Sequence, residues 1–403
     1  MEKLTLLFDA TILINFFRKN GSRSGIFFCS YNLLKQFQIQ HQFNIILYVN
    51  NHVTKGILGL NKDFACFSYL VKHRKFLSGR NSTNKNKEFF ESIHAYFSAT
   101  SFIPNEIKEQ RHIRCFTLLH DTIPLVFPQY YSHSASKWET RKFSSLDMQT
   151  YYFCNSEQTK RDYLKYCHDK IDEKKCVTTY IASSQVFKPI RGQGNTNIFV
   201  NHHRIPITKR KYLFSFCTLE PRKNLFFTLN CFIKFIRKHQ IDDLYFYLGG
   251  GHWRSFIGQF EQDLKGFGAY RNKIIYLGYI ADRDVNIFYS NSLFFTYLSQ
   301  YEGFGMPPLE AMLAGTPVIT SNNSSLPEVV GDAAIMIEYN NEEQCIKAFE
   351  DLYFNEALRK KYIEKGIERA KFFSWEKTVR CMTETITKVC ENETNSRITY
   401  YVK

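Results

Sequence analysis

Short apolar runs alternate with longer segments of helical periodicity along almost the whole chain. In the first half we predict strands at 4–9, 44–49, 115–119, 151–154 and 176–181. A second series follows at 212–217, 244–249, 274–277, 293–297, 317–320 and 334–337, with helices between most strands, for example at 224–239 and 308–314. This alternation indicates parallel sheets with helices on both faces. Because 403 residues suffice for two such domains, we predict an α/β fold of two doubly wound, Rossmann-like domains.

The segment between the two series is polar, contains glycine and proline, and shows no periodicity. We therefore expect a first domain at 1–189, a linker at 190–209, a second domain at 210–380, and a C-terminal helix and tail at 381–403. At the N-terminus, Asp9 and Asn15 interrupt the apolar run, which favours a buried first strand over a signal peptide. No stretch reaches the roughly 20 apolar residues that span a bilayer.

Positive charge is concentrated in the first half of the chain. The net charge is +15, and residues 1–200 hold 27 Lys and Arg against 15 Asp and Glu. The densest basic run, with Phe76 and Leu77 inside it, comprises Lys72, Arg74, Lys75, Arg80, Lys85 and Lys87. This run is either a solvated surface or a docking site for an anionic membrane surface. Since the sequence contains no recognisable nucleic-acid-binding module, we expect no nucleic-acid partner.

The loop after the strand at 293–297 reads SQYEGFGMPPLEAMLAG. Gly303 and Gly305 bracket Phe304 and let the backbone turn tightly and approach a ligand. Pro307 and Pro308 suit the start of a helix, where a missing N–H costs nothing. The free N–H groups of that helix start, together with the positive end of its dipole, predict a site for a diphosphate.

Two carboxylates belong to the same loop and helix. Glu302 precedes the glycines, and Glu310 follows eight residues later, in the expected first helical turn. Such a pair can hold the hydroxyls of one ring and the vicinal diol of a ribose. Taken singly, Glu310 is equally well explained as favourable charge near a helix N-terminus, and Glu302 as a solvated loop acid.

The complete pattern EGFGMPPLEAMLAGTPVI, followed by LPEVVGDAA, resembles the retaining glycosyltransferases of family 4, which have the GT-B fold. The resemblance covers about 210–385 and, more weakly, 1–185. It implies two Rossmann-like domains facing a cleft, with a C-terminal helix that crosses back to the first domain. It further implies that Glu302 contacts the transferred sugar and Glu310 the nucleoside ribose, while Phe304, Gly305 and Met306 offer backbone contacts to the donor.

The strand at 212–217 leads into TLEPRKNL. Arg222 can pair bidentately with phosphate oxygens, whereas Lys223 acts as a point charge. Alone, such a basic pair is more often a surface feature. Its position after the first strand of the second domain resembles the family's diphosphate site, which neutralises the departing charge. Cys217 departs from the family at this strand end, where relatives often carry glycine.

Further site residues follow from the same resemblance. His120, in LLHDTIPLVFP, is implied to reach the reaction centre or the sugar hydroxyls, as a neutral imidazole can near neutral pH. Gly25 matches the glycine loop on the acceptor side. Gly278 and Tyr279 match the strand end that holds the nucleobase. We expect no metal site, because Asp282 of the DRD sequence fits a helix cap better than a metal ligand.

The resemblance implies a retaining, metal-independent hexosyltransferase that needs no cofactor besides its nucleotide-sugar donor. The HD-x-IP and LEPRKN motifs are most similar to bacterial mannosyltransferases, which favours GDP-mannose over a UDP-hexose. The acceptor would be a lipid-linked saccharide of lipopolysaccharide, O-antigen or capsule synthesis, and the protein would act in the cytoplasm on the inner face of the cell membrane. The alternatives are a GT-B nucleotide-sugar epimerase or phosphorylase, and a non-catalytic membrane-binding adaptor.

Overall fold

The computed structural model describes residues 3–15, 25–49, 76–78, 90–130, 142–190, 197–200, 203–207, 210–251 and 254–401. The chain divides into two compact units. The first consists of Met1–Ile181 together with Ser374–Lys403, and the second of Ala182–Phe373. The chain therefore leaves the first unit at Ile181 and returns to it at Ser374, against sequence-based boundaries at 189 and 381.

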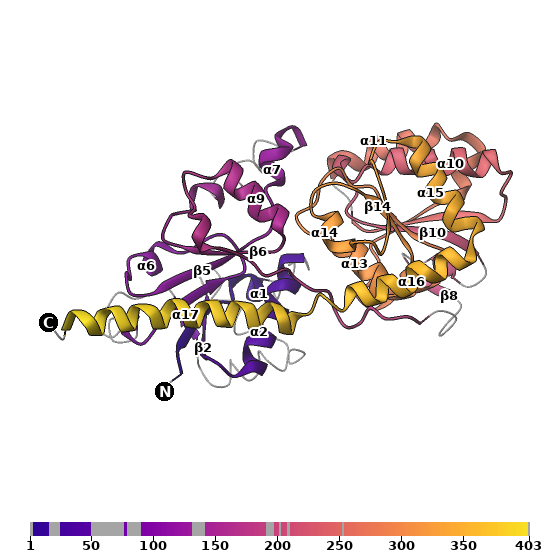
Figure 1. Cartoon of the computed structure of the whole chain (residues 1–403). Helices are drawn as coiled ribbons and strands as arrows, with labels where there is room; N and C mark the ends of the chain where they lie inside the picture. Colours follow the sequence, from indigo (N-terminus) through magenta and orange to yellow (C-terminus); the bar gives the residue numbers. More distant parts are fainter. Residues whose placement is uncertain are drawn as a thin grey trace. The chain divides into compact units, whose positions relative to one another are not determined.

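The first unit contains a seven-stranded parallel sheet in the order β3-β2-β1-β4-β5-β6-β7. The strands are β1 (Thr5–Asp9), β2 (Asn44–Val49), β3 (Phe76–Ser78), β4 (Ala95–Ser98), β5 (Arg114–Leu119), β6 (Tyr151–Cys154) and β7 (Cys176–Thr178). Figure 1 shows α2 (Gly25–Gln40) and α17 (Trp375–Tyr401) on one face, and α6 (Asn105–Lys108) and α9 (Glu157–Tyr166) on the other. Because both faces are covered, the middle of β1 is a run of three fully buried apolar residues, Leu6, Leu7 and Phe8.

The sequence missed two strands of this sheet. β4 has the short sequence AYFS, yet it lies beside β1 at the centre of the sheet. β3 falls inside the run that we interpreted as a basic surface, and it pairs with β2 as an edge strand. The basic residues of that run (Lys72, Arg74, Lys75, Arg80, Lys85 and Lys87) lie outside the described residues.

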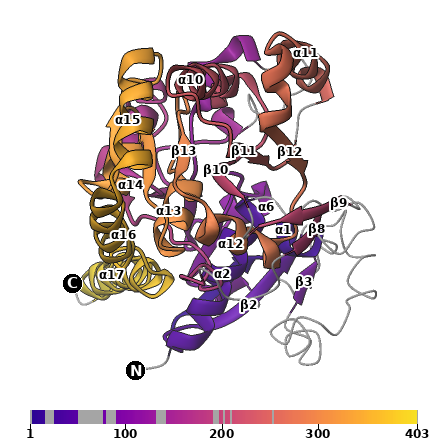
Figure 2. The ribbon, with the colours of Figure 1, turned by 90° about the vertical axis from the view of Figure 1, so that its right-hand side faces the viewer.

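The second unit contains a six-stranded parallel sheet in the order β12-β11-β10-β13-β14-β15. All six strands were predicted: β10 (Lys211–Phe216), β11 (Leu244–Gly249), β12 (Ile274–Gly278), β13 (Phe295–Tyr297), β14 (Val318–Ser321) and β15 (Ile335–Ile337). Figure 2 shows α10 (Leu225–Lys238) and α15 (Glu342–Phe354) on one side of the sheet, and α12 (Asp282–Asn291) and α13 (Met306–Leu313) on the other. The remaining helices include α11 (Arg254–Lys265), α14 (Leu326–Val330) and α16 (Glu356–Ala370).

The expectation of an irregular linker at 190–209 was wrong in part. β8 (Asn197–Val200) and β9 (His203–Pro206) form an antiparallel hairpin within this segment. A two-stranded ribbon needs only a few alternating residues, so its signal is too short to stand out from the polar residues around it.

Both large sheets are wound outward from a central pair of strands. In the first sheet the winding direction reverses between β1 and β4, and in the second between β10 and β13. Ligands of open parallel sheets bind beyond the carboxyl ends of the strands at such a reversal. The order of the strands therefore singles out two sheet edges, one in each unit.

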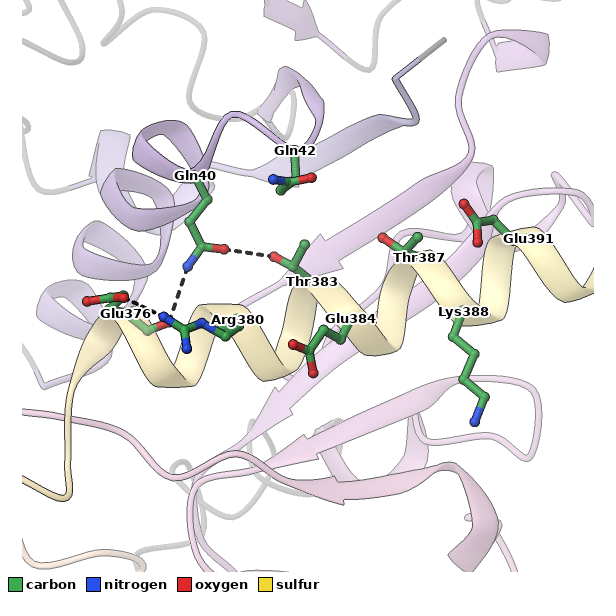
Figure 3. A pocket seen from close by; sticks show the side chains of 9 residues that line it. All are labelled: Gln40, Gln42, Glu376, Arg380, Thr383, Glu384, Thr387, Lys388 and Glu391. Carbon is green, nitrogen blue, oxygen red and sulfur yellow. Dashed lines mark hydrogen bonds and ion pairs between the residues drawn. The ribbon is translucent and has the colours of Figure 1, made fainter. Parts of the chain in front are cut away.

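Helix α17 completes the first unit. Val379, Met382 and Ile386 are fully buried along one side of the helix, at the spacing of an α-helical stripe. A cavity of about 630 Å³ lies where the end of α2 meets α17, and Figure 3 shows the side chains that line it. There the Nε2 of Gln40 donates to the carbonyl oxygen of Glu376 at 3.2 Å. The cavity lies near the start of β2, at the amino edge of the sheet, and its polar groups tie the two helices together.

None of the helices in the part of the chain that the structure covers is long and apolar enough to cross a membrane.

The burial of Ile386 predicts its contribution to stability. Replacing Ile386 with alanine should lower the free energy of unfolding of the first unit by about 2–5 kcal/mol, because a cavity replaces the buried side chain. Urea unfolding, monitored by limited proteolysis of the first unit, measures the change in the free energy of unfolding. The matched control is Glu384→Ala on the exposed side of the same helix, and a loss as large in the control would contradict this interpretation.

Candidate functional site

The residues expected to bind the donor converge at the reversal point of the second sheet. Arg222 and Lys223 lie in a short 3-10 helix, Pro221–Lys223, after β10. Glu302 lies in the loop after β13, the strand next to β10. The N–H of Gln300 donates to the carbonyl oxygen of Arg222 at 2.9 Å and joins the two loops. Parallel pairing of β10 with β13 thus brings together charges that are 79 residues apart in sequence.

Glu302 is the centre of a compact polar cluster. Its Oε1 lies 2.6 Å from the Nζ of Lys223 and 2.9 Å from the Nη1 of Arg222. The same oxygen accepts a hydrogen bond from the hydroxyl of Tyr297 at 2.9 Å. The Nζ of Lys223 also donates to that hydroxyl at 2.7 Å. Each of these four residues is at most 9% exposed, so the cluster is shielded from water.

A second buried acid, Glu220, completes the charge balance. Glu220 forms an ion pair with Arg222, and its Oε1 lies 3.9 Å from the Nζ of Lys223. Two cations therefore face two carboxylates, which is how a protein can bury charge without a prohibitive loss of solvation. Burial alone would raise the pKa of Glu302. The charges of Arg222 and Lys223 together outweigh burial and lower this pKa to about 2. Glu302 is consequently ionised throughout the physiological pH range.

Serines of the loop between β14 and α14 hold the loop that carries Glu302. The N–H of Glu302 donates to the Oγ of Ser324 at 2.9 Å. The Oγ of Ser325 lies 3.0 Å from the carbonyl oxygen of Glu302 and 2.7 Å from that of Phe304. The ring of Phe304 packs edge-on against Phe373, with 5.5 Å between centroids. The backbone of the loop is thereby fixed while its side chains fill the interior.

Gly305 makes the sharp entry into α13 possible. Its φ is +113°, and a Cβ atom at this position would lie 2.8 Å from the Cδ2 of Leu326. The helix begins at Met306, and Pro307 and Pro308 occupy its second and third positions, within the first turn. It begins two residues earlier than we expected. The expectation that Glu310 lies in the first turn was therefore wrong, since the first turn contains no acidic residue.

Glu310 has a definite partner in the structure. Its Oε2 accepts a hydrogen bond from the hydroxyl of Tyr289 at 3.0 Å. Burial and the nearby Glu310 carboxylate raise the pKa of Tyr289 well above its ordinary value. The hydroxyl of Tyr289 therefore stays protonated and remains a hydrogen donor to Glu310.

The remaining residues that the sequence analysis singled out lie outside the cluster around Glu302. Gly278 ends β12, and Tyr279, which follows it, is 64% exposed, so its ring is accessible to a planar partner. Asp282 is the first residue of α12 and Ala281 is its N-cap, so our assignment of Asp282 as the cap was wrong. Gly25 begins α2, and a Cβ atom there would meet open space.

The departure noted at Cys217 is accommodated by the adjacent strand. Gly250 follows β11 with φ of +124°, and a Cβ atom there would lie 1.9 Å from the carbonyl oxygen of Cys217. The N–H of Cys217 donates to the carbonyl oxygen of Gly249 at 3.1 Å. The close approach of the two backbones therefore depends on Gly250, directly after β11, and not on the residue at position 217.

His120 lies in the first unit, directly after β5. Its Nε2 lies 2.7 Å from the carbonyl oxygen of Ala99. Since a carbonyl only accepts, Nε2 carries the hydrogen and Nδ1 presents a lone pair. Burial lowers the pKa of His120, and the charge of Lys142 acts in the same direction. The structure thus selects one tautomer of a neutral imidazole, which the sequence left open.

Sequence reasoning missed two members of the cluster, Glu220 and Tyr297. Glu220 stands in the LEPRKN motif, where an acid beside two basic residues was a usable signal for internal charge pairing. Tyr297 resembled an ordinary core residue at the end of a strand. Among the described residues, no group of three or more His, Cys, Asp or Glu side chains is arranged to hold a metal ion.

A family model described as Glycosyl transferases group 1 matches residues 199–369, which include the whole cluster. This part of the chain, which holds the second sheet, is therefore similar to the group 1 glycosyltransferases. Group 1 glycosyltransferases, also called GT4, are in general retaining and metal-independent hexosyltransferases. This similarity agrees with the resemblance that the EGFGMPPLE pattern indicated.

Proteins similar to this chain include bacterial mannosyltransferases. O-antigen chain mannosyltransferase B of Escherichia coli is 28% identical over 284 residues, 70% of this chain and 72% of that protein. Serotype-specific mannosyltransferase WbdA of Escherichia coli is 24% identical over 286 residues. That match covers 68% of this chain but 33% of WbdA, so the chain spans about a third of the longer protein.

Solved structures share the fold across nearly the whole chain. Anabaena Alr3699/HepE, determined in complex with UDP and glucose, has a TM-score of 0.64 at 12% identity and covers 96% of this chain and 100% of its own. WaaG, a glycosyltransferase involved in lipopolysaccharide biosynthesis, has a TM-score of 0.64 at 11% identity and covers 95% and 99%. These matches confirm the GT-B fold, whereas the cleft expected between its units remains a prediction.

The strained backbone of Gly305 predicts a strong response to substitution. Gly305→Ala should lower the free energy of unfolding by about 1–3 kcal/mol, because alanine disfavours this φ and its methyl group collides with Leu326. The matched control is Gly258→Ala in α11, where a Cβ atom meets nothing within 4 Å. That change should be neutral or slightly stabilising. Thermal unfolding compares the two variants, and equal Tm values would contradict the analysis.

The charge balance of the cluster predicts an unusual effect of Glu302→Gln. In the ligand-free protein the Glu302 carboxylate forms ion pairs with the two cations that we expect to bind a diphosphate. Its neutralisation should tighten binding of GDP or UDP about tenfold while sugar transfer falls. Isothermal titration calorimetry measures the dissociation constants. Glu350→Gln, which removes a carboxylate paired with Lys238 and His239, controls for net charge; weaker nucleotide binding by Glu302→Gln than by this control would contradict the prediction.

Proposed function

We propose that this glycosyltransferase moves a hexose, with mannose favoured, from a nucleotide sugar to a hydroxyl of a lipid-linked saccharide. The supporting observation is the buried cluster of Arg222, Lys223 and Glu302 at the reversal point of the second sheet. The similarity to O-antigen mannosyltransferases supports GDP-mannose over a UDP-hexose as donor. The pathway would be lipopolysaccharide, O-antigen or capsule synthesis on the inner face of the cell membrane.

Each charged site residue of the second unit that the sequence singled out has a proposed role in holding the donor. Arg222 and Lys223 stabilise the diphosphate, on which negative charge develops as it leaves. Glu302 accepts hydrogen bonds from hydroxyls of the transferred sugar once the diphosphate takes its place beside the two cations. Glu310 holds the ribose diol.

Backbone and aromatic groups complete the donor site in this proposal. Phe304, Gly305 and Met306 direct main-chain groups toward the sugar or the phosphates. Gly278 and the exposed ring of Tyr279 border the nucleobase. On the side of the first unit, Gly25 and His120 face the acceptor and the reacting sugar.

The proposed reaction keeps the configuration of the sugar. The bond between the anomeric carbon and the phosphate oxygen breaks, and a bond from that carbon to the acceptor oxygen forms on the same face. The leaving diphosphate takes the proton of the acceptor hydroxyl. Arg222 and Lys223 contribute by stabilising the departing charge, so their removal should affect the transition state more than the bound donor.

Identification of the donor tests this proposal most directly. GDP-mannose, at 100 times its dissociation constant, should stabilise the protein by about 2.7 kcal/mol. UDP-glucose at the same concentration should stabilise it less. Thermal unfolding with each nucleotide sugar measures the difference, and mass spectrometry with octyl α-mannoside as acceptor detects the product. The control is Gly258→Ala, which should respond as the wild type does.

Other outcomes would replace the proposal. Conversion of the donor in the absence of acceptor, with no transfer in its presence, would identify an epimerase. Phosphate-dependent release of a sugar phosphate would identify a phosphorylase. Binding to anionic vesicles without any effect of nucleotide sugars would favour the non-catalytic adaptor.

A further inference from the structure

The cavity where the end of α2 meets α17 is an open groove on the first unit, which we call the α2–α17 groove (Figure 3). Its lining residues are all polar: Gln40, Gln42, Glu376, Arg380, Thr383, Glu384, Thr387, Lys388 and Glu391. All of them belong to the first unit. Gly25 lies at the opposite end of α2, and His120 lies at the opposite edge of the sheet. The groove is therefore remote from both residues of this unit that have a proposed role in sugar transfer.

Four charged residues of α17 line the groove, alternate in sign and are spaced four residues apart. We call them the charged row: Glu376, Arg380, Glu384 and Lys388. Residues at this spacing lie on one side of a helix at intervals of about 6 Å, so the row is about 18 Å long. All four are exposed, and the side chains of Glu376 and Arg380 are 64% and 60% exposed. The row can therefore meet a second helix over several turns.

A row of this kind is often neutralised within its own helix by ion pairs between residues i and i+4. In α17 the first of these pairs is formed, because the Nη2 of Arg380 lies 2.5 Å from the Oε1 of Glu376. Within the part of the chain that the structure describes, neither Glu384 nor Lys388 forms an ion pair. A negative and a positive charge of the row therefore remain for a partner.

The floor of the groove is fixed and consists of short side chains. The hydroxyl of Thr383 donates to the Oε1 of Gln40 at 3.3 Å. The Nε2 of Gln40 donates in turn to the carbonyl oxygen of Glu376. Thr387, one turn further along α17, is half-buried. Short side chains beside the charged row allow a second helix to approach to the distance of about 8–10 Å at which helices pack.

The charged row is complementary to itself when two copies lie antiparallel. In a pairing centred on Met382, Glu376 faces Lys388 of the second copy. Arg380 then faces Glu384 of the second copy. A two-fold axis generates each pair twice, so every charge of both rows meets an opposite charge. A parallel pairing in register would instead place each charge opposite its own copy. The pattern thus selects both the partner and its direction.

We infer that the α2–α17 groove is an interface between two copies of this chain, in which the two α17 helices pack antiparallel and the charged rows form four ion pairs. The inference does not depend on the proposed function. A contact of this size lies at the low end of the range for protein interfaces, and exposed ion pairs are individually weak. The dimer is therefore reversible, and its dissociation constant lies in the micromolar range and rises with salt.

Sedimentation velocity of the full chain at about 100 μM, in about 0.05 M and about 0.5 M salt, tests the dimer. The wild type should be mostly dimeric at low salt and monomeric at high salt. Arg380→Glu with Lys388→Glu makes the charged row wholly acidic, and Glu376→Lys with Glu384→Lys makes it wholly basic. Each double variant alone should be monomeric, because like charges then face one another.

A one-to-one mixture of the two double variants should dimerise again at low salt, which repair of a folding defect cannot explain. Both variants keep a net positive charge, so overall attraction between the two chains cannot produce this rescue either. The matched control is Lys347→Glu with Lys360→Glu, which changes the net charge of the chain as the acidic variant does and breaks two i,i+4 ion pairs on α15 and α16. This control should dimerise as the wild type does.

Lys388→Gln replaces the double variants if thermal unfolding shows that they are unfolded, and it should raise the dissociation constant of the dimer about fivefold. A wild type that is monomeric at low salt would overturn the inference. So would a mixture that stays monomeric, a control that fails to dimerise, or equal dissociation constants for Lys388→Gln and the wild type.

Discussion

Burial of four charges at one sheet edge is the constraint on which the second unit depends. Arg222, Lys223, Glu220 and Glu302 are each less than a tenth exposed, and an unpaired charge in such surroundings would be strongly destabilising. The pairing therefore dictates how the loops after β10 and β13 approach one another. Serines hold the backbone of the second loop so that the carboxylate of Glu302 meets both cations. Chemistry and local folding at this edge depend on the same contacts.

The two sheet edges carry different chemical groups. The edge of the second sheet holds two cations paired with a carboxylate, where we propose that a diphosphate binds. The edge of the first sheet holds His120, a neutral imidazole whose Nε2 donates to the carbonyl oxygen of Ala99. Both edges arise from the same strand order, in which the winding reverses beside the first strand of the unit. Side chains on one architecture thus give its two copies different charge.

The sequence predicts well what depends on local pattern, and poorly what depends on neighbours distant along the chain. Every strand of the second sheet was recognised because each is a distinct apolar run. A helix after Gly305 followed from its prolines, although α13 begins two residues earlier than expected. The short strand β4 was missed because four residues carry little pattern, although its place beside β1 makes it central. The ion pair of Lys223 with Glu302 depends on β10 lying next to β13, and no local signal contains that information.

The route of the chain has a consequence for synthesis on the ribosome. The second unit is one continuous segment, Ala182–Phe373, and can fold as soon as it has emerged. The first unit begins to emerge earlier, yet it lacks α17 until the residues after Ser374 have been made. Until then the surface that Val379, Met382 and Ile386 cover is exposed to water. The nascent protein therefore carries an open apolar groove for most of its translation, a natural site for a chaperone to occupy until the final helix docks.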